Sequence, residues 1–173
     1  MLPQLSMEQA DRIASAAADC AKRNRFNPVA IHVIDTAGDV IVSKTMDGCP
    51  KKGIPEFAYG KAYSAISMQS SSRTFRDKYT AAGDVARFTQ MLAMNANSGN
   101  KMNSAPGGVV LKTAEGQVIG AVGVSGAAGD EDEYCAMRGV IEANLDVVME
   151  PSEHCCTTHK DEENEDYSIK TFD

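Results

Sequence analysis

The sequence lacks any apolar run long enough to cross a membrane. No stretch approaches the roughly 18 consecutive apolar residues that a spanning helix needs. The opening residues, MLPQLSME, also lack the basic and apolar regions of a secretory signal peptide. These absences predict a soluble, cytoplasmic protein with no membrane partner. The chain has 173 residues, of which 43% are hydrophobic and 24% charged, so it is long enough to bury a core without metal or disulfide support.

Cysteine and histidine are scarce. Five cysteines are an odd number at a density far below that of disulfide-rich scaffolds, so we expect free thiols in a reducing compartment. One cluster, HCCTTH from His154 to His159, contains both residue types. Adjacent cysteines do not easily occupy two corners of one tetrahedron, which disfavours zinc there. Motifs of phosphate loops, Rossmann folds and zinc hydrolases are absent, and hydrolytic triads find little support.

The net charge of −7 is unevenly distributed. Residues 150–173 hold eight acidic residues against two lysines, a local charge of −6. Residues 44–112 hold ten basic residues against four acidic ones, a local charge of +6. Nucleic-acid binding is not expected, because it favours a strongly basic domain. The basic segment is either an ordinary solvated surface or a surface for an anionic ligand or the acidic segment.

Hydrophobic periodicity predicts an α+β domain over residues 1–150, followed by an acidic C-terminal tail over residues 151–173. Two hairpins separated and flanked by helices indicate an antiparallel sheet that is covered on at least one face. The expected elements are a helix from Ser6 to about Asn24, strands at 29–35 and 40–46, a helix from Glu56 to about Gln69, two short helices between Ser70 and Asn97 interrupted at Gly83, strands at 109–112 and 118–124, and a helix from Asp130 to Met149.

Glycine-bearing segments flank the second hairpin. PGG at 106–108 opens one strand, and GAVGVSGA at 120–127 closes the next. Glycines allow a ligand or a neighbouring backbone to approach closely, and a strand that ends in Ser-Gly before a helix can offer backbone amides to an anion. Each segment taken alone is better explained by tight packing and turn geometry.

Several blocks in a fixed order resemble the GlcG/HbpS haem-binding family, also called haem-degrading, which includes the C-terminal domain of PduO adenosyltransferases. The resemblance covers about Leu5 to Met149. It implies a profilin-like α+β fold with an antiparallel sheet of about five strands, assembly into homo-oligomers of at least two subunits, and a pocket near the subunit interface. The blocks are an alanine-rich helix, VIDTAG at 33–38, KTMDG at 44–48, KAYSA at 61–65, PGGV at 106–109 and GAVGVSG at 120–126.

The resemblance also implies a haem ligand near the end of the first helix. Haem-binding PduO-type members have a histidine there, and Cys20 falls at or within one residue of that position. A thiolate can ligate haem iron, but Cys20 also fits the apolar stripe of the helix. His32 is the other candidate ligand, although a histidine on a covered strand is often a core residue. We expect any haem site to require one of these two residues.

Lys61 is the candidate catalytic residue. It matches the lysine of the family's KAxxA block, and a buried stem beside the PGG loop would let its ammonium meet a carboxylate or an enolate. An exposed helical lysine is the alternative interpretation. A cofactor-free enzyme would use Lys61 with backbone amides of the glycine segments to hold an anionic intermediate.

These observations favour an oligomeric protein that binds haem, or a related anionic small molecule, near a subunit interface. The residues expected to contact the ligand are Cys20, His32, Gly107, Gly108, Ser125 and Gly126. Catalysis is left open. The alternatives are the cofactor-free enzyme and a non-catalytic structural subunit that docks through its acidic tail. We expect the oligomer interface to include the sheet edge and the glycine segments.

Overall fold

The computed structural model describes residues 4–81, 83–143 and 147–151. The acidic tail beyond Pro151, with its HCCTTH cluster, lies outside the described residues. No helix within the described ranges is long and apolar enough to cross a membrane. The elements in chain order are α1 (Met7–Arg23), β1 (Ala30–Ile34), β2 (Val40–Thr45), α2 (Ile54–Met68), α3 (Ser72–Tyr79), α4 (Val85–Asn97), β3 (Gly108–Lys112), β4 (Val118–Ser125), α5 (Gly129–Glu142) and β5 (Val148–Glu150).

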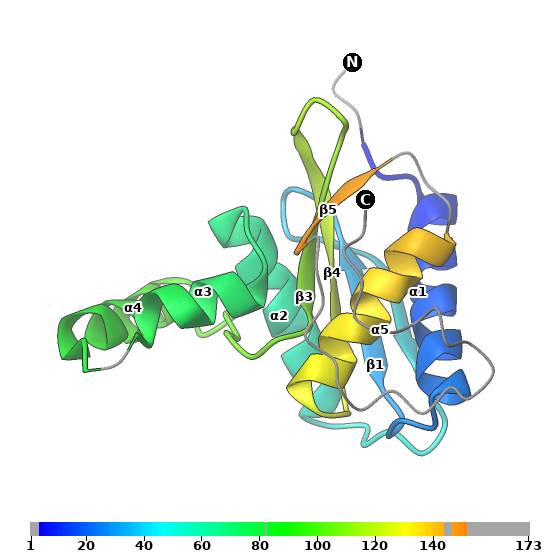
Figure 1. Ribbon diagram of the computed structural model, residues 1–173, viewed down its shortest axis with the longest axis horizontal. Coiled ribbons are helices and arrows are strands. Elements are labelled where there is room, and N and C mark those ends of the chain that lie inside the picture. The colour runs from blue at the N-terminus through cyan, green and yellow to red at the C-terminus, as the bar shows by residue number, and fades with distance from the viewer. Residues whose placement is uncertain (1–3, 82, 144–146, 152–173) are drawn as a thin grey trace.

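Five strands form one antiparallel sheet in the order β2-β1-β4-β3-β5. Helices α1 and α5 cover one face and α2 covers the other (Figure 1). The predicted α+β fold with five strands is confirmed. The expected helix from Asp130 to Met149 is too long, because α5 ends at Glu142 and Val148–Glu150 pair with β3 as a short strand. That strand satisfies backbone groups that would otherwise form an open sheet edge.

The first helix begins with a capping box. The Ser6 hydroxyl accepts a hydrogen bond from the Gln9 amide at 3.1 Å, and the Gln9 side chain accepts one from the Ser6 amide at 2.9 Å. The buried stripe of α1 packs against α5 and the sheet. The two helices approach closely because Gly139 has no side chain: a Cβ atom there would lie 2.7 Å from the carbonyl oxygen of Ile13.

Two glycines allow α2 to lie almost on the backbone of β3 and β4. A Cβ atom at Gly123 would lie 2.0 Å from the carbonyl oxygen of Ala58, and one at Gly108 would lie 2.2 Å from that of Lys61. Strand β4 is the central strand of the sheet, not an edge. Gly108 and Gly123 therefore contact α2 of the same chain. An oligomer interface that includes the sheet edge and the glycine segments stays a prediction.

Helices α3 and α4 form an arm that extends away from the sheet (Figure 1). The predicted pair of short helices is confirmed, and the break falls at the turn that contains Gly83. Side chains cap both helices: Ser71 accepts from the Thr74 amide, and Asp84 accepts from the Arg87 amide.

A methyl group at Gly123 should separate α2 from the sheet. We predict that Gly123→Ala lowers the free energy of unfolding by about 3 kcal/mol, because the contacting atom is a backbone oxygen that cannot rotate away. Gly116→Asn is a matched control, since Gly116 has open space around it and asparagine tolerates its positive φ of 84°. Urea unfolding that showed equal stability for the two variants would contradict this account of α2 packing.

Candidate functional site

His32 is the one large side chain in a row of small residues across the sheet. In the strand register it lies opposite Ser43 of β2 on one side and Gly123 of β4 on the other, and Gly123 lies opposite Gly108. Directly paired residues project from the same face of a sheet. The row therefore faces α2, and the small neighbours leave room around the imidazole ring.

The imidazole of His32 is half-buried and incompletely hydrogen-bonded. Its Nδ1 atom is buried and has no hydrogen-bond partner among the described residues, while Nε2 lies 3.5 Å from the Ser43 hydroxyl. The ring packs edge to face against Tyr59 of α2, with 6.1 Å between ring centroids. Burial lowers the pKa of His32, and the nearby Glu56 carboxylate opposes that shift. The ring is therefore neutral at pH 7, the form that ligates metals.

Two adjoining hollows open on the α2 side of the molecule. One has a volume of about 410 Å³ and is lined by His32, Pro55, Glu56, Tyr59, Asn100 and Lys101. The other, about 360 Å³, lies between α2 and the arm, and its lining includes Phe57, Phe75, Met91 and Leu92. They share Glu56, Asn100 and Lys101. Both volumes fall within the range of about 300–1,000 Å³ that is typical of small-molecule sites.

One aromatic ring, that of Tyr59, and two charged side chains of opposite sign, Glu56 and Lys101, line the first hollow. The Tyr59 hydroxyl donates a hydrogen bond to the Gly38 carbonyl at 3.1 Å, which fixes the ring beside His32. Tyr63 follows one turn later, with 5.8 Å between the two ring centroids. The Lys101 ammonium lies 5.5 Å from the Tyr63 centroid. The hollow thus combines one tyrosine ring, a neutral imidazole, a carboxylate and an ammonium group.

Cys20 lies on the opposite face of the sheet from His32. It is fully buried on the core face of α1, and the side-chain nitrogen Nδ2 of Asn24 lies 3.6 Å from its sulfur. It borders neither of the two hollows. The structure therefore separates the two candidate haem ligands, and one iron cannot take both side chains from the same subunit.

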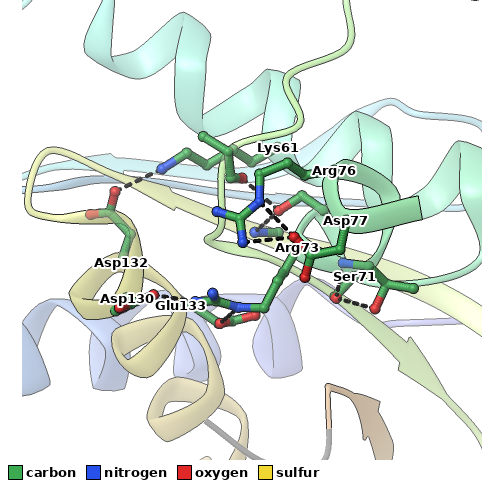
Figure 2. A network of polar contacts seen from close by, with 12 residues as sticks. Lys61, Ser71, Arg73, Arg76, Asp77, Asp130, Asp132 and Glu133 are labelled. Carbon is green, nitrogen blue, oxygen red and sulfur yellow. Dashed lines mark hydrogen bonds and ion pairs between the residues drawn. The ribbon is translucent and has the colours of Figure 1, made fainter. Parts of the chain in front are cut away.

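Lys61 is buried in an ion pair. Only 3% of the residue is exposed, and its ammonium donates to Asp132 of α5 at 2.7 Å and to the Val124 carbonyl at 3.0 Å (Figure 2). Burial raises the pKa of Asp132 to about 6, opposed by the attraction of Lys61. Burial also lowers the pKa of Lys61, opposed by Asp132. The carboxylate of Asp132 is ionised at neutral pH and already pairs with the ammonium of Lys61.

A second buried ion pair ties the arm to α5. The guanidinium of Arg73 on α3 contacts Asp130 and donates to the fully buried Glu133 at 2.6 Å (Figure 2). Of the ten basic residues between Lys44 and Lys112, six pair with acidic residues of the described chain. Most of the basic segment thus serves internal ion pairs, and Lys101 is the basic residue that lines both hollows.

The glycine segments make internal contacts. The Gly108 amide donates to the Ser72 hydroxyl at 2.9 Å. A Cβ atom at Gly107 would lie 2.5 Å from the Val124 carbonyl oxygen, and one at Gly126 would lie 2.4 Å from that of Pro28. Ser125 is buried opposite Ala30. Lys61 thus lies beside the PGG loop, where its ammonium pairs with Asp132 and the glycines contact neighbouring backbone. Cys20 and His32 lie away from this loop.

Sequence reasoning missed two groups of residues. Asp132 lies in the first turn of the helix expected from Asp130, and the spacing of 71 residues from Lys61 gives no local signal of their pairing. Glu56, Asn100 and Lys101 line the hollow from a helix start and a loop, positions that carry no motif.

Comparison with known proteins identifies the family of this chain. A family model described as "Haem degrading protein HbpS-like" matches residues 5–141. The chain belongs to the HbpS-like family. A comparison with curated proteins found no match.

Solved structures of HbpS-like proteins share the fold. HbpS is 27% identical, with a TM-score of 0.66 over 82% of this chain and 91% of that one. A complex of PduOC with haem is 22% identical, with a TM-score of 0.72 over 84% and 98% of the two chains. Klebsiella pneumoniae protein ORFY is 21% identical, with a TM-score of 0.71 over 84% and 94%.

The buried Lys61–Asp132 pair should behave as a structural unit. We predict that Lys61→Met and Asp132→Asn each cost about 3–5 kcal/mol of stability, because each leaves a buried charged group without its partner. The double variant should be far more stable than the sum of the single losses predicts, which a double-mutant cycle measured by urea unfolding would quantify. Lys44→Met is the control, since Lys44 pairs with Asp11 in a solvent-accessible position and should lose less than about 1 kcal/mol. Additive losses in the cycle would contradict the pairing.

Proposed function

We propose that this chain binds haem, or a related flat anionic ligand, in the hollow on the α2 side, with His32 as the ligand to the metal. The carrying observation is that the neutral ring of His32 borders the hollow, and that its Nδ1 atom has no hydrogen-bond partner among the described residues. The family description and the haem complex of PduOC support haem as the first candidate.

The residues of the hollow fit this ligand. A neutral imidazole is a common axial ligand of haem iron. The flat side of a porphyrin would pack against the ring of Tyr59, which is held in place by its hydrogen bond to Gly38. The ammonium of Lys101 is placed to meet a carboxylate of the ligand. Bound haem would supply a redox-active iron, while the chain's own residues bind and orient the ring.

The position of Cys20 favours His32 as the ligand. A thiolate at Cys20 would reach iron only if α1 or α5 moved off the sheet, because the sulfur lies inside the main core. Ligation by Cys20 stays a prediction that the variants below test separately.

Catalysis through Lys61 receives less support from the same geometry. Lys61 lines neither hollow, and its ammonium already has Asp132 and the Val124 carbonyl as partners. The cofactor-free enzyme and the structural subunit docking by its acidic tail stay alternatives. The tail itself lies outside the described residues.

Removing the imidazole should weaken haem binding. We predict that titration of the purified chain with haem gives a Soret band, and that His32→Ala lowers the affinity more than about tenfold. Cys20→Ala is the matched control and should bind like the wild type. Added imidazole should restore the Soret band of the His32→Ala complex, because it can enter the space that the ring leaves.

The same titration distinguishes the candidate ligands. A Cys20→Ala variant that lost the Soret band while His32→Ala kept it would overturn the assignment of His32. If the double variant Cys20→Ala, His32→Ala kept an unchanged spectrum, neither residue would be the ligand.

Haem affinity should depend on pH through His32. Since burial lowers the pKa of His32 below its ordinary value of 6.5, affinity should be constant near neutrality and fall as the pH drops below that lowered pKa. The fall approaches tenfold per pH unit, because a protonated ring cannot bind iron. Binding measured between pH 5 and pH 8 checks this, with His32→Ala as the variant whose residual binding should lack the same transition. Affinity that rises on acidification would contradict the prediction.

A further inference from the structure

The second hollow lies between α2 and the arm and has a volume of about 360 Å³. His32 does not border it. Three helices contribute apolar side chains to its lining: Phe57 of α2, Phe75 of α3, and Met91 and Leu92 of α4. Phe75 is only 1% exposed, so the lining reaches the interior of the molecule. The hollow therefore offers a small ligand an apolar surface that the proposed haem ligand does not touch.

Two side chains of opposite charge, Glu56 and Lys101, line the same hollow. Neither forms an ion pair with another residue of the described chain. The Glu56 carboxylate accepts a hydrogen bond from the Gly53 amide at 2.8 Å, and the Lys101 ammonium lies 5.5 Å from the ring centroid of Tyr63. Neither contact neutralises the charge, so both charges remain available to a ligand.

This pair of charges indicates which class of ligand fits. A ligand with a carboxylate alone would be attracted by Lys101 but repelled by Glu56, and a ligand with an amine alone would meet the reverse. A ligand that carries both charges is complementary to both side chains.

Two asparagines add hydrogen-bond donors beside Lys101. The side-chain oxygens of Asn95 and Asn103 accept from the backbone amides of Met102 and Ala105, each at 2.9 Å. Their side-chain nitrogens are therefore the atoms that have no hydrogen-bond partner among the described residues. Both asparagines line the hollow. An amide nitrogen donates two hydrogen bonds, so these groups suit a carboxylate.

The loop that carries these donors is fixed on α2. The Asn103 amide donates to the Gly60 carbonyl at 3.1 Å and to the Ser64 hydroxyl at 2.8 Å. The loop approaches this closely because Gly60 has no side chain: a Cβ atom there would lie 3.0 Å from the Lys101 carbonyl oxygen. The polar part of the lining is thus in place before a ligand arrives, which lowers the entropic cost of binding.

We propose that the second hollow binds a free α-amino acid with a large apolar side chain. The carboxylate of the ligand faces Lys101 and the amide nitrogens of Asn95 and Asn103, and its ammonium faces Glu56. Its side chain packs among the apolar residues of α2, α3 and α4. The proposal does not depend on haem binding, and its test uses the chain without haem.

The first test is calorimetric titration of the full chain with L-phenylalanine and three analogues that each lack one feature. 3-Phenylpropanoate lacks the ammonium, 2-phenylethylamine lacks the carboxylate, and glycine lacks the apolar side chain. We expect L-phenylalanine to bind, and each analogue to bind at least about tenfold more weakly, because each leaves part of the lining without a partner. No binding of L-phenylalanine at millimolar concentration would overturn the proposal, and so would an analogue that bound equally well.

The second test removes one charge at a time. Lys101→Met should lower the affinity for L-phenylalanine about tenfold and leave that for 2-phenylethylamine unchanged, because the amine has no carboxylate. Lys78→Met is the matched control: the Lys78 ammonium also lies 5.5 Å from a tyrosine centroid, that of Tyr79, but Lys78 borders neither hollow. Glu56→Gln keeps an acceptor for the Gly53 amide and should abolish the preference for L-phenylalanine over 3-phenylpropanoate. Unchanged selectivity in both charge variants would contradict the assignment.

A third variant locates the ligand, because Glu56 and Lys101 line both hollows. Met91 lines the second hollow but not the first. Met91→Ser should therefore weaken the binding of L-phenylalanine, since the side chain of the ligand loses an apolar contact. If Lys101→Met weakened binding while Met91→Ser bound like the wild type, the ligand would lie in the first hollow and the proposal would be wrong.

Discussion

The rest of the structure depends on how closely α2 approaches the sheet. Because Gly108 and Gly123 carry no side chain, the backbone of α2 lies directly on β3 and β4. That approach buries the stem of Lys61, and its ammonium pairs with Asp132 and a backbone carbonyl. It also positions Tyr59 against His32. The sequence suggested that these glycines bind an anion. In the structure they allow α2 and the sheet to pack closely.

The fold could be predicted from the sequence because its signals are local. Each of these signals acts within a few residues: the alternating and helical apolar patterns, the capping box at Ser6 and the break near Gly83. The end of α5 could not be predicted in this way. Val148–Glu150 look like a continuation of the helix, and they become a strand because β3 offers a free edge. That edge exists only once the rest of the sheet has formed.

The candidate site was less predictable, because it depends on contacts between residues that are far apart in the sequence. His32 and Cys20 were both identifiable as candidate ligands, but only the sheet decides that they project to opposite faces. Sequence reasoning placed Lys61 beside the PGG loop, and the partner that occupies it comes from a helix 71 positions away. Residues such as Glu56 and Lys101 join the hollow through tertiary contacts, without any motif. The family membership shows the fold, while the proposed ligand-binding residues rest on this chain's own geometry.

The central claim is that a metal-containing ligand binds on the α2 side of the sheet beside His32. The most direct measurement is a crystal structure of the chain grown with haem, with anomalous data at the iron absorption edge to locate the metal. The account predicts an iron peak at direct coordination distance from a ring nitrogen of His32, with the porphyrin in the hollow bordered by Tyr59. An iron peak beside Cys20, on the face covered by α1 and α5, would contradict it.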